Sequence, residues 1–360
     1  MSALQGPPGQ GPAARIDWLD YGKGICIILV VMLYAVEVTS DRMGHAGWLQ
    51  VVADFAKPFR MPDFFLLSGL LLPLVIDRPW RRYVDRKVVH FAYFYVLWFT
   101  ILYAFRLPDT LRTEGGIVGA AMGYAIGWVK PFSMLWFIYM LAIFFVVTRL
   151  VRRINPLLVW VAAAALHLAA PDTGIKVVEK FTQYYVFFFT GFACSARVFA
   201  FARQVAAHRA LAAAGVAAWA VVNGALVFGG LSTLAGLGLV LSFAGSAAVI
   251  AVSVLIAPFR AARFIGYCGA NTIVIYLAFF IPLTVTRKAL SVAGLGDPGT
   301  VAALATAGGI LGALVLFWAV RRTRLRFLFE RPAWLSIDRG PARAARAPLA
   351  EGDVADLGAR

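Results

Sequence analysis

Long apolar stretches alternate with short polar connections along the whole of this chain. A membrane-spanning helix needs about 20 mostly apolar residues, and ten stretches reach or approach that length. The predicted spans are residues 22–40, 62–76, 88–105, 132–148, 156–170, 181–201, 210–228, 236–257, 265–286 and 301–320. The second and fifth are short, and the apolar segment 115–128 is interpreted as a re-entrant or interfacial piece. The pattern predicts an all-α integral membrane protein, a bundle of about ten transmembrane helices.

The composition agrees with a membrane protein. Hydrophobic residues make up 61% of the 360 residues and charged residues only 14%, whereas soluble domains are about 45–50% apolar. So few charges exclude a water-soluble domain of this size. The Gly/Pro-rich start and the Ala/Gly/charge-rich end predict disordered tails over residues 1–14 and 337–360. One transmembrane domain is therefore expected over residues 15–336.

The net charge of +16 comes from 34 Lys and Arg against 18 Asp and Glu. We interpret this excess as the positive-inside rule and not as nucleic-acid binding. Alternate connections carry basic residues with few acids, namely Arg78, Arg81, Arg82, Arg86, Lys87, Arg149, Arg152, Arg153, Arg197, Arg203, Arg209, Arg260 and Arg263. The opposite connections hold nearly balanced charges. The asymmetry predicts that both termini are cytoplasmic. We therefore expect a multi-pass chain in the lipid bilayer of the cell inner (plasma) membrane.

Cysteine and histidine give no sign of a metal site. Cys26, Cys194 and Cys268 lie in apolar segments without a CxxC spacing, and the four histidines are scattered singly. Structural metal sites draw on closely spaced cysteine and histidine ligands. We therefore predict no metal and no bound cofactor.

Polar residues interrupt the first span, and they are candidates for chemistry because polar groups at bilayer depth are costly. Eleven residues, at ~1.5 Å each, carry the helix about 16 Å from Lys23 at its start to Tyr34. Glu37 follows on the same helix face. In the structural interpretation, Lys23 is an interfacial anchor, Tyr34 a packing residue and Glu37 an outer carboxylate. In the functional interpretation, all three belong to a catalytic or transport cavity.

The segment KPFRMPDFFLLSG around the second span is rich in ionisable residues. Lys57, Arg60 and Asp63 follow one another at intervals of three, so they can share a helix face and pair. Ser68 precedes a glycine, a pair that permits close helix approach. We predict that Arg60, Asp63 and Ser68 line a membrane-embedded cavity. The alternative is an ion pair at the outer interface.

A basic connection, DRPWRRYVDRKVVH, follows the second span. Its five basic residues exceed what orientation requires, and guanidinium groups suit phosphate. We predict that Arg82 and Arg86 bind the phosphates of an anionic donor; a topology signal is the alternative. Trp136, Asn271 and Tyr276 bring polar groups into the fourth and ninth spans. They are predicted to line the same cavity, or to bond neighbouring helices.

Five stretches together resemble the acyltransferase-3 family of integral membrane acyltransferases. In chain order they are DYGKGICIILVVMLY, PFRMPDFFLLSG, RRYVDRK, LWFIYML and GANTIVIYL, and the resemblance runs from Ile16 to Trp334. It implies transfer of an acyl group, often acetyl, to a hydroxyl. The donor it implies is cytoplasmic acyl-coenzyme A (acyl-CoA), and the acceptor is an envelope glycan or a small hydroxylated molecule.

The chain departs from the family pattern at two positions. Tyr34 stands where the resemblance places an essential histidine, and Phe279 where it places a second one. Imidazole, with a pKa of about 6.5, suits a general base, whereas a phenol with a pKa of about 10 is only about a thousandth ionised at pH 7. Tyr34 therefore cannot simply replace histidine. Three alternatives stay open: Glu37 is the base with Tyr34 as its hydrogen-bond partner, His45 folds back into the site, or acyl transfer is lost.

The sequence thus predicts a membrane acyltransferase that moves an acyl group from acyl-CoA to a hydroxyl of an envelope glycan or related molecule. Lys23, Tyr34 and Glu37 are the candidate catalytic residues. The alternative is a catalytically inactive homologue that acts in export or transport of a glycan, lipid or small molecule. The sequence predicts no oligomeric state.

Overall fold

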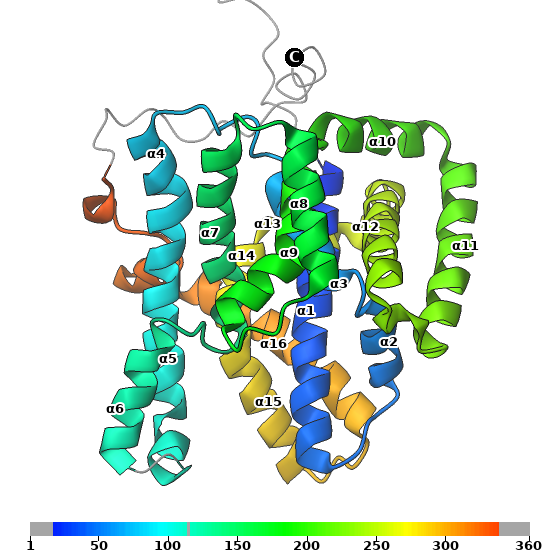
Figure 1. The fold of residues 1–360 in the computed structure, drawn as a ribbon. Coiled ribbons are helices and arrows are strands. Elements are labelled where there is room, and N and C mark those ends of the chain that lie inside the picture. The colour runs from blue at the N-terminus through cyan, green and yellow to red at the C-terminus, as the bar shows by residue number, and fades with distance from the viewer. Residues whose placement is uncertain (1–16, 114–115, 338–360) are drawn as a thin grey trace, which may run out of the picture.

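The computed structural model describes residues 17–113 and 116–337, and this part of the chain folds into helices and turns without a strand. The first α-helices are α1 (Asp17–Met43), α2 (Leu49–Ala56), α3 (Arg60–Gly69), α4 (Trp80–Val84), α5 (His90–Thr113), α6 (Gly116–Gly127), α7 (Trp136–Val151) and α8 (Pro156–Ala169). The others are α9 (Lys176–Ala193), α10 (Ser195–Ala207), α11 (Arg209–Phe228), α12 (Ala235–Ile256), α13 (Arg263–Ala270), α14 (Thr272–Ala278), α15 (Phe280–Val292) and α16 (Pro298–Val320). They stand together as one bundle, as the all-α prediction requires (Figure 1).

Six helical segments of the described chain are long and apolar enough to cross a membrane. They are Asp17–Met43, Trp80–Arg112, Ser133–Val151, Arg209–Phe228, Gly236–Ile256 and Pro298–Val320. Two bent helix pairs raise the number to eight if each pair is one span. The predicted count of about ten is not confirmed, because α3 has 10 residues and α8 has 14, fewer than the about 20 that a bilayer requires. These are the two spans that are already short in the sequence.

The predicted span 181–201 is bent and not straight. It turns by 74° at Cys194, between α9 and α10, so α10 lies across one end of the bundle (Figure 1). The composition of α10 explains the turn, because the helix buries Phe199 while Arg197 and Arg203 are exposed. Such an amphipathic helix suits a membrane surface better than an apolar interior.

The predicted span 265–286 is divided among three helices. Asn271 separates α13 from α14, and these segments meet at 67°; α15 begins directly afterwards at Phe280. The apolar segment 115–128 forms α6, whose 12 residues are too few to span a bilayer. This helix packs along α5, where the Tyr103 hydroxyl donates to the backbone oxygen of Ala120 at 2.6 Å.

Glycines let the central helices touch backbone to backbone. At Gly69, where α3 meets α9, an added Cβ would overlap the backbone oxygen of Phe188. At Gly269, where α13 meets α1, an added Cβ would overlap the backbone oxygen of Asp20. Close approach at small residues is typical of packing between membrane helices. These contacts fix α1, α3, α9 and α13 as the centre around which the candidate site forms.

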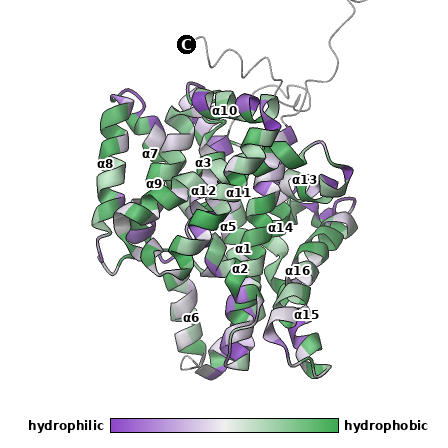
Figure 2. Ribbon diagram, turned by 90° about the vertical axis from the view of Figure 1, so that its right-hand side faces the viewer, coloured by the Kyte–Doolittle hydropathy of each residue, from purple (hydrophilic) through white to green (hydrophobic). Residues whose placement is uncertain are grey.

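Hydrophilic residues gather towards the two ends of the bundle, and apolar residues dominate its middle (Figure 2). Trp18 at the start of α1 packs against Phe199 of α10 with ring centres 5.6 Å apart. The last described residues are held near α4, because Arg331 and the backbone N–H of Ile337 donate to the Asp85 carboxylate at 2.6 and 2.7 Å. The cytoplasmic placement of both termini stays a prediction. The predicted tails lie outside the described residues, except for Ile337 itself.

Candidate functional site

A cavity of about 330 Å³ opens between α1, α3, α7, α13 and α14, and we call it the inner cavity. Most of its wall is apolar, with phenylalanine, leucine and isoleucine side chains. Its polar lining residues are Lys23, Ser68, Lys87, Thr272 and Tyr276. Three of the predicted site residues, Lys23, Ser68 and Tyr276, therefore meet around one space although they come from three different helices.

Two lysines give the inner cavity its positive charge. Lys23 lies near the start of α1, and Lys87 lies on the π-helical turn η1 (Asp85–Val89) that joins α4 to α5. Both are half-buried. The Lys87 ammonium sits 4.4 Å from the ring centre of Phe145, a cation–π distance. An apolar cavity with two ammonium groups suits a ligand that is anionic at one end and apolar along the rest.

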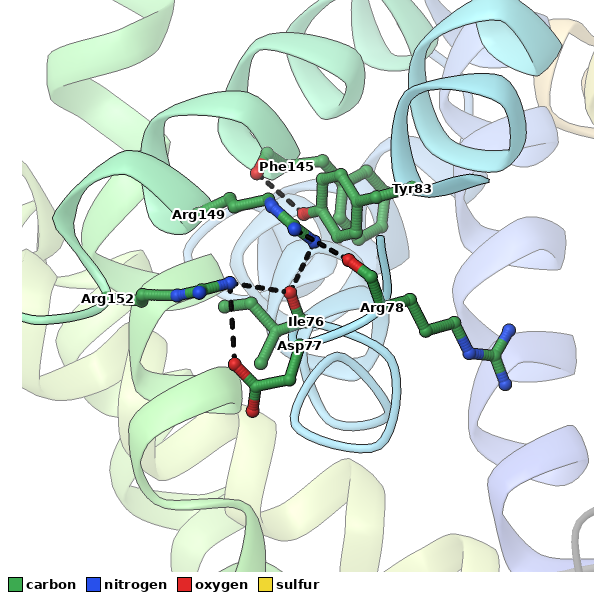
Figure 3. Close-up of polar contacts among 7 residues, drawn as sticks. All are labelled: Ile76, Asp77, Arg78, Tyr83, Phe145, Arg149 and Arg152. Atoms are coloured by element: carbon green, nitrogen blue, oxygen red, sulfur yellow. Dashed lines mark hydrogen bonds and ion pairs between the residues drawn. The ribbon is translucent and has the colours of Figure 1, made fainter. Parts of the chain in front are cut away.

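Arginines at the end of α7 fix the turn that leads towards Lys87 (Figure 3). Arg149 donates to the backbone oxygens of Ile76 and, at 2.6 Å, Arg78. Arg152 donates to the same Ile76 oxygen at 3.0 Å and lies 3.4 Å from the Asp77 carboxylate. Both arginines belong to the basic residues that predict orientation. They also satisfy the backbone oxygens of Ile76 and Arg78 in the irregular turn between α3 and α4.

The predicted phosphate-binding pair, Arg82 and Arg86, does not line the inner cavity. Both side chains are exposed on α4 and η1. Among the five basic residues of this connection, Lys87 is the one that faces the cavity. The sequence alone does not show that Lys87 faces this cavity, because the side-chain directions depend on the π-helical turn. Phosphate binding by this segment stays a prediction.

Tyr276 closes the far end of the inner cavity. Its hydroxyl donates to the backbone oxygen of Met134, and its ring centre lies 5.6 Å from that of Phe137. Tyr276 also interacts electrostatically with Tyr34. Tyr276 therefore lies between the inner cavity, which it lines, and Tyr34, which belongs to the second group of predicted residues.

Tyr34 and Phe279, which stand at the two histidine positions of the family pattern, touch each other. Their ring centres are 5.6 Å apart and the rings are tilted by 57°. Phe279 is completely buried and Tyr34 is half-buried. Trp136 is a hydrogen-bond partner of the Tyr34 side chain. Two positions far apart in the sequence thus form one site, but aromatic rings occupy the places where the resemblance expects imidazoles.

Charged groups surround this aromatic pair on its outer side. Glu37 interacts electrostatically with Tyr34 and with Arg60. Arg60 donates to the backbone oxygen of Ala53 at 3.2 Å, and Arg106 also interacts with Tyr34. Glu37 is exposed at the surface of the bundle. We call Tyr34, Glu37, Arg60, Arg106 and Trp136 the outer cluster; four of the five are predicted site residues.

The structure places Asp63 and Asn271 elsewhere. The Asp63 carboxylate is fully buried between α1 and α3, where the Cys26 thiol donates to it at 2.7 Å. It therefore does not pair with Arg60 or Lys57 as the spacing suggests. The Asn271 side chain donates to the backbone oxygen of Tyr267 at 2.9 Å, so it stabilises the break between α13 and α14. Its two neighbours in the sequence line the inner cavity instead.

A second space, which we call the outer cleft, was missed by the sequence prediction. It has a volume of about 550 Å³ and lies between α8, α9 and the start of α12. Its lining includes Lys57, His167, Asp172, Glu179, Tyr184 and Ser242. In the sequence, Asp172 and Glu179 stand out only as acids that balance the charge of the connection. The ring centre of Tyr184 lies 5.3 Å from that of Trp136, so two aromatic rings separate this cleft from Tyr34.

Comparisons with known proteins agree with the resemblance. The model of the acyltransferase-3 family, described as an acyltransferase domain, matches residues 16–321. The chain is 25% identical over 296 residues to nodulation protein NolL of Sinorhizobium fredii, which covers 76% of this chain and 79% of that protein. It is 25% identical over 193 residues to inner membrane protein YcfT of Escherichia coli, which covers 47% of this chain and 54% of that protein.

No solved structure matches the chain. The family match nevertheless extends over most of the sequence, from the residue before α1 to the end of α16. The described helices that are long and apolar enough to cross a membrane all lie within the same residues. The chain is therefore a multi-pass membrane protein and belongs to the acyltransferase-3 family.

Proposed function

We propose that this chain is a membrane acyltransferase that moves an acyl group from acyl-CoA to a hydroxyl of an envelope glycan or related molecule. The observation that carries the proposal is the inner cavity, whose mostly apolar wall includes Lys23, Lys87 and Tyr276. Acyl-CoA combines anionic phosphates with a long, less polar arm that ends in the thioester. Its phosphates would meet the two ammonium groups through charge-assisted hydrogen bonds.

The inner cavity would hold the thioester arm and not the whole donor. Its apolar wall and its volume of about 330 Å³ suit the arm. The nucleotide would remain outside, on the side where Arg82 and Arg86 are exposed. The acyl group would then lie against Tyr276, next to the outer cluster.

The outer cleft supports a hydroxyl-rich acceptor. It offers carboxylates at Asp172 and Glu179, an imidazole at His167 and the aromatic ring of Tyr184. A few polar groups set against aromatic walls can orient a ligand of this kind. The acceptor would approach from this side while the donor approaches through the inner cavity.

Acyl transfer breaks the thioester C–S bond and forms a C–O bond to the acceptor. A general base must take the hydroxyl proton, and the departing sulfur leaves as a thiolate or takes up a proton. We assign the base to Glu37, because it is the carboxylate of the outer cluster and interacts with Tyr34. Tyr34, with its Trp136 partner, would orient the acceptor hydroxyl. Arg60, whose positive charge attracts the Glu37 carboxylate, would help to hold it in the cluster.

A second function follows from the contact between Tyr34 and Phe279. If aromatic rings at both histidine positions have ended acyl transfer, the scaffold serves export or transport of a glycan, lipid or small molecule. In either case we place the chain in the inner membrane, which the name of YcfT supports. No feature of the cavities favours transport over transfer, so acyl transfer remains the proposed function.

Turnover of acetyl-CoA by the purified protein tests the proposal. We expect coenzyme A release that Glu37→Gln removes while acetyl-CoA still binds. The double variant Tyr34→His with Phe279→His separates the two functions. In a working enzyme the new imidazoles displace the aromatic pair and lower turnover. If the wild type is inactive and the double variant gains turnover, the scaffold is an idle acyltransferase and the second function is correct.

A further inference from the structure

The described chain continues beyond α16 in a short segment, residues 324–337, that we call the C-terminal strap. It contains the 3₁₀ turns Arg324–Leu328 and Ala333–Leu335 and lies beside α4 and α5 (Figure 1). The family match ends at residue 321, so the strap lies outside the matched domain. None of its described residues lines the inner cavity or the outer cleft. Any influence of the strap on these spaces must therefore pass through the helices that it contacts.

Hydrogen bonds and aromatic packing dock the strap on α5. The Tyr93 hydroxyl donates to the backbone oxygen of Phe327 at 2.8 Å, and the Trp98 indole N–H donates to that of Leu328 at 2.9 Å. Phe329 is buried, and its ring centre lies 5.6 Å from that of Trp98. These contacts hold the strap against the helix that continues directly from the π-helical turn η1.

The end of the strap surrounds the side chain of Asp85, the first residue of η1. Arg331 donates to the Asp85 carboxylate at 2.6 Å and to the Asp85 backbone oxygen at 2.8 Å. The Ser336 hydroxyl and the backbone N–H of Ile337 donate to the carboxylate at 3.1 and 2.7 Å. The Arg331 and Asp85 side chains are only 12% and 5% exposed. Within the part of the chain that the structure describes, every hydrogen-bond partner of this carboxylate belongs to the strap.

A different side of the same turn is held by α7. The Tyr83 hydroxyl donates to the backbone oxygen of Phe145 at 2.7 Å, and the Lys87 ammonium lies 4.4 Å from the ring centre of Phe145. Tyr83 and Lys87 are four residues apart and share a face, whereas residues two apart, such as Asp85 and Lys87, do not face each other. The turn η1 is therefore held between the strap, which binds Asp85, and the inner cavity, which Lys87 lines.

We propose that Arg331 is a positioning residue for the anionic ligand of the inner cavity. By clamping Asp85 it fixes the rotation of η1 and so directs Lys87 into the cavity. This inference rests on the proposed function, in which the ligand is acyl-CoA. Without Arg331 the buried Asp85 carboxylate loses its cationic partner, which is costly. The turn would then rotate to bring the carboxylate to water, and Lys87 would leave the cavity with it.

A purely structural clamp is the competing explanation, and Lys87 distinguishes the two. If Arg331 acts through Lys87, removing Arg331 costs no further affinity once Lys87 is gone. If the strap only stabilises the bundle, removing Arg331 costs the same affinity with or without Lys87. A double-mutant cycle measures this coupling between the two residues.

Calorimetric titration with acetyl-CoA of the wild type, Arg331→Gln, Lys87→Gln and the double variant completes the cycle. We expect Arg331→Gln to bind acetyl-CoA about tenfold more weakly, the loss that one charge-assisted hydrogen bond to the ligand accounts for. The double variant should bind no more weakly than Lys87→Gln. Arg326→Gln is the matched control, because it removes the same charge from an exposed position of the strap, and it should bind like the wild type.

Asp85→Asn reaches the same clamp from its other side. The amide still offers an oxygen to the other donors of the strap but lacks the charge that holds Arg331. It should therefore also weaken binding of acetyl-CoA, and only where Lys87 is present. Equal losses from Arg331→Gln with and without Lys87 would overturn the proposal. Unchanged affinity in Arg331→Gln, or in Asp85→Asn if Arg331→Gln does not fold, would overturn it too.

Inorganic pyrophosphate, used as a second probe, separates these results from a failure of the proposed function. If the wild type binds pyrophosphate but not acetyl-CoA, and the cycle with pyrophosphate shows the coupling, acyl-CoA is not the ligand while the positioning role of Arg331 stands. If pyrophosphate binding shows no coupling between Arg331 and Lys87, or if the wild type binds neither probe, the positioning role is refuted.

Discussion

The two halves of α1 differ in what surrounds them. Around Lys23, the neighbouring helices leave a cavity of about 330 Å³ with two lysines in its wall. Around Tyr34, the aromatic ring of Phe279 lies in contact and fills the space. Under the proposed function, the inner half of α1 keeps charged groups that suit an acyl-CoA donor. The half around Tyr34 lacks the histidine that the family pattern expects there.

The largest effect is expected from Glu37→Gln. The amide has nearly the same shape but cannot accept a proton, so acyl transfer should fall by about 10²- to 10⁴-fold, the contribution of a general base. Coenzyme A release measured with the purified variant gives the result. Asp41→Asn is the matched control, because Asp41 lies one turn further along α1 and also interacts with Glu37. Equal losses in the two variants would mean that the charge of the cluster matters and that Glu37 is not the base.

Removing a cavity lysine should have the second largest effect. Lys87→Gln deletes a cation that faces the inner cavity, and we expect acyl-CoA to bind about tenfold more weakly, since a charge-assisted hydrogen bond contributes about 1.5–3 kcal/mol. Arg86→Gln, at the adjacent exposed position, should have a smaller effect because water screens an exposed charge. Calorimetric titration with acetyl-CoA compares the binding affinities of the two variants. A larger loss of acetyl-CoA affinity in Arg86→Gln than in Lys87→Gln would indicate that the donor binds at the exposed arginines and not in the inner cavity.

Much of this fold follows from apolar patterning alone, but the bends do not. The spans of α1, α11, α12 and α16 appear in the sequence as long, mostly apolar runs, and the helices follow them. The turn at Cys194 depends on where the membrane surface cuts an amphipathic segment. The break at Asn271 depends on side-chain bonding within the folded bundle. Neither is a property of a short sequence window.

The candidate site shows the same limit. The family pattern locates Tyr34 and Phe279, so their contact could be expected from the sequence. By contrast, the spacing of Arg60 and Asp63 suggests an ion pair, yet Asp63 bonds Cys26 instead. The outer cleft is assembled from the consecutive helices α8 and α9, the start of α12, and Lys57 from a much earlier part of the chain. No local pattern marks residues that meet only through tertiary packing.

A moderate effect on stability is expected where α13 touches α1. Gly269→Ala places a methyl group against the backbone oxygen of Asp20, and such overpacking costs about 1–3 kcal/mol. Gly236→Ala, in open space on α12, should be neutral or stabilising, because alanine is favoured over glycine in helices by about 1 kcal/mol. Thermal unfolding in detergent measures the stability of both variants relative to the wild type. Equal stability of the two variants would show that the inner half of α1 is not closely packed.

The smallest effect is expected from Tyr34→Phe. The change removes a hydroxyl that has Trp136 as its partner and leaves the packing against Phe279 in place. A single hydrogen bond contributes about 0.5–1.5 kcal/mol, so acyl transfer should fall only severalfold. The rate of acyl transfer by the purified Tyr34→Phe variant tests this expectation. A loss as large as that of Glu37→Gln would give Tyr34 a direct part in proton transfer and would weaken the contrast between the two halves of α1.

A structure of the protein with a non-reactive thioether analogue of acetyl-CoA tests the central claim most directly. The account predicts density for the arm of the analogue in the inner cavity, with its phosphates beside Lys23 and Lys87 and its acyl end against Tyr276. Lys87→Gln should weaken this density, and a variant of the outer cleft such as Asp172→Asn should not. Density in the outer cleft, or an empty inner cavity at a saturating concentration of the analogue, would contradict the assignment of the cavity to the donor.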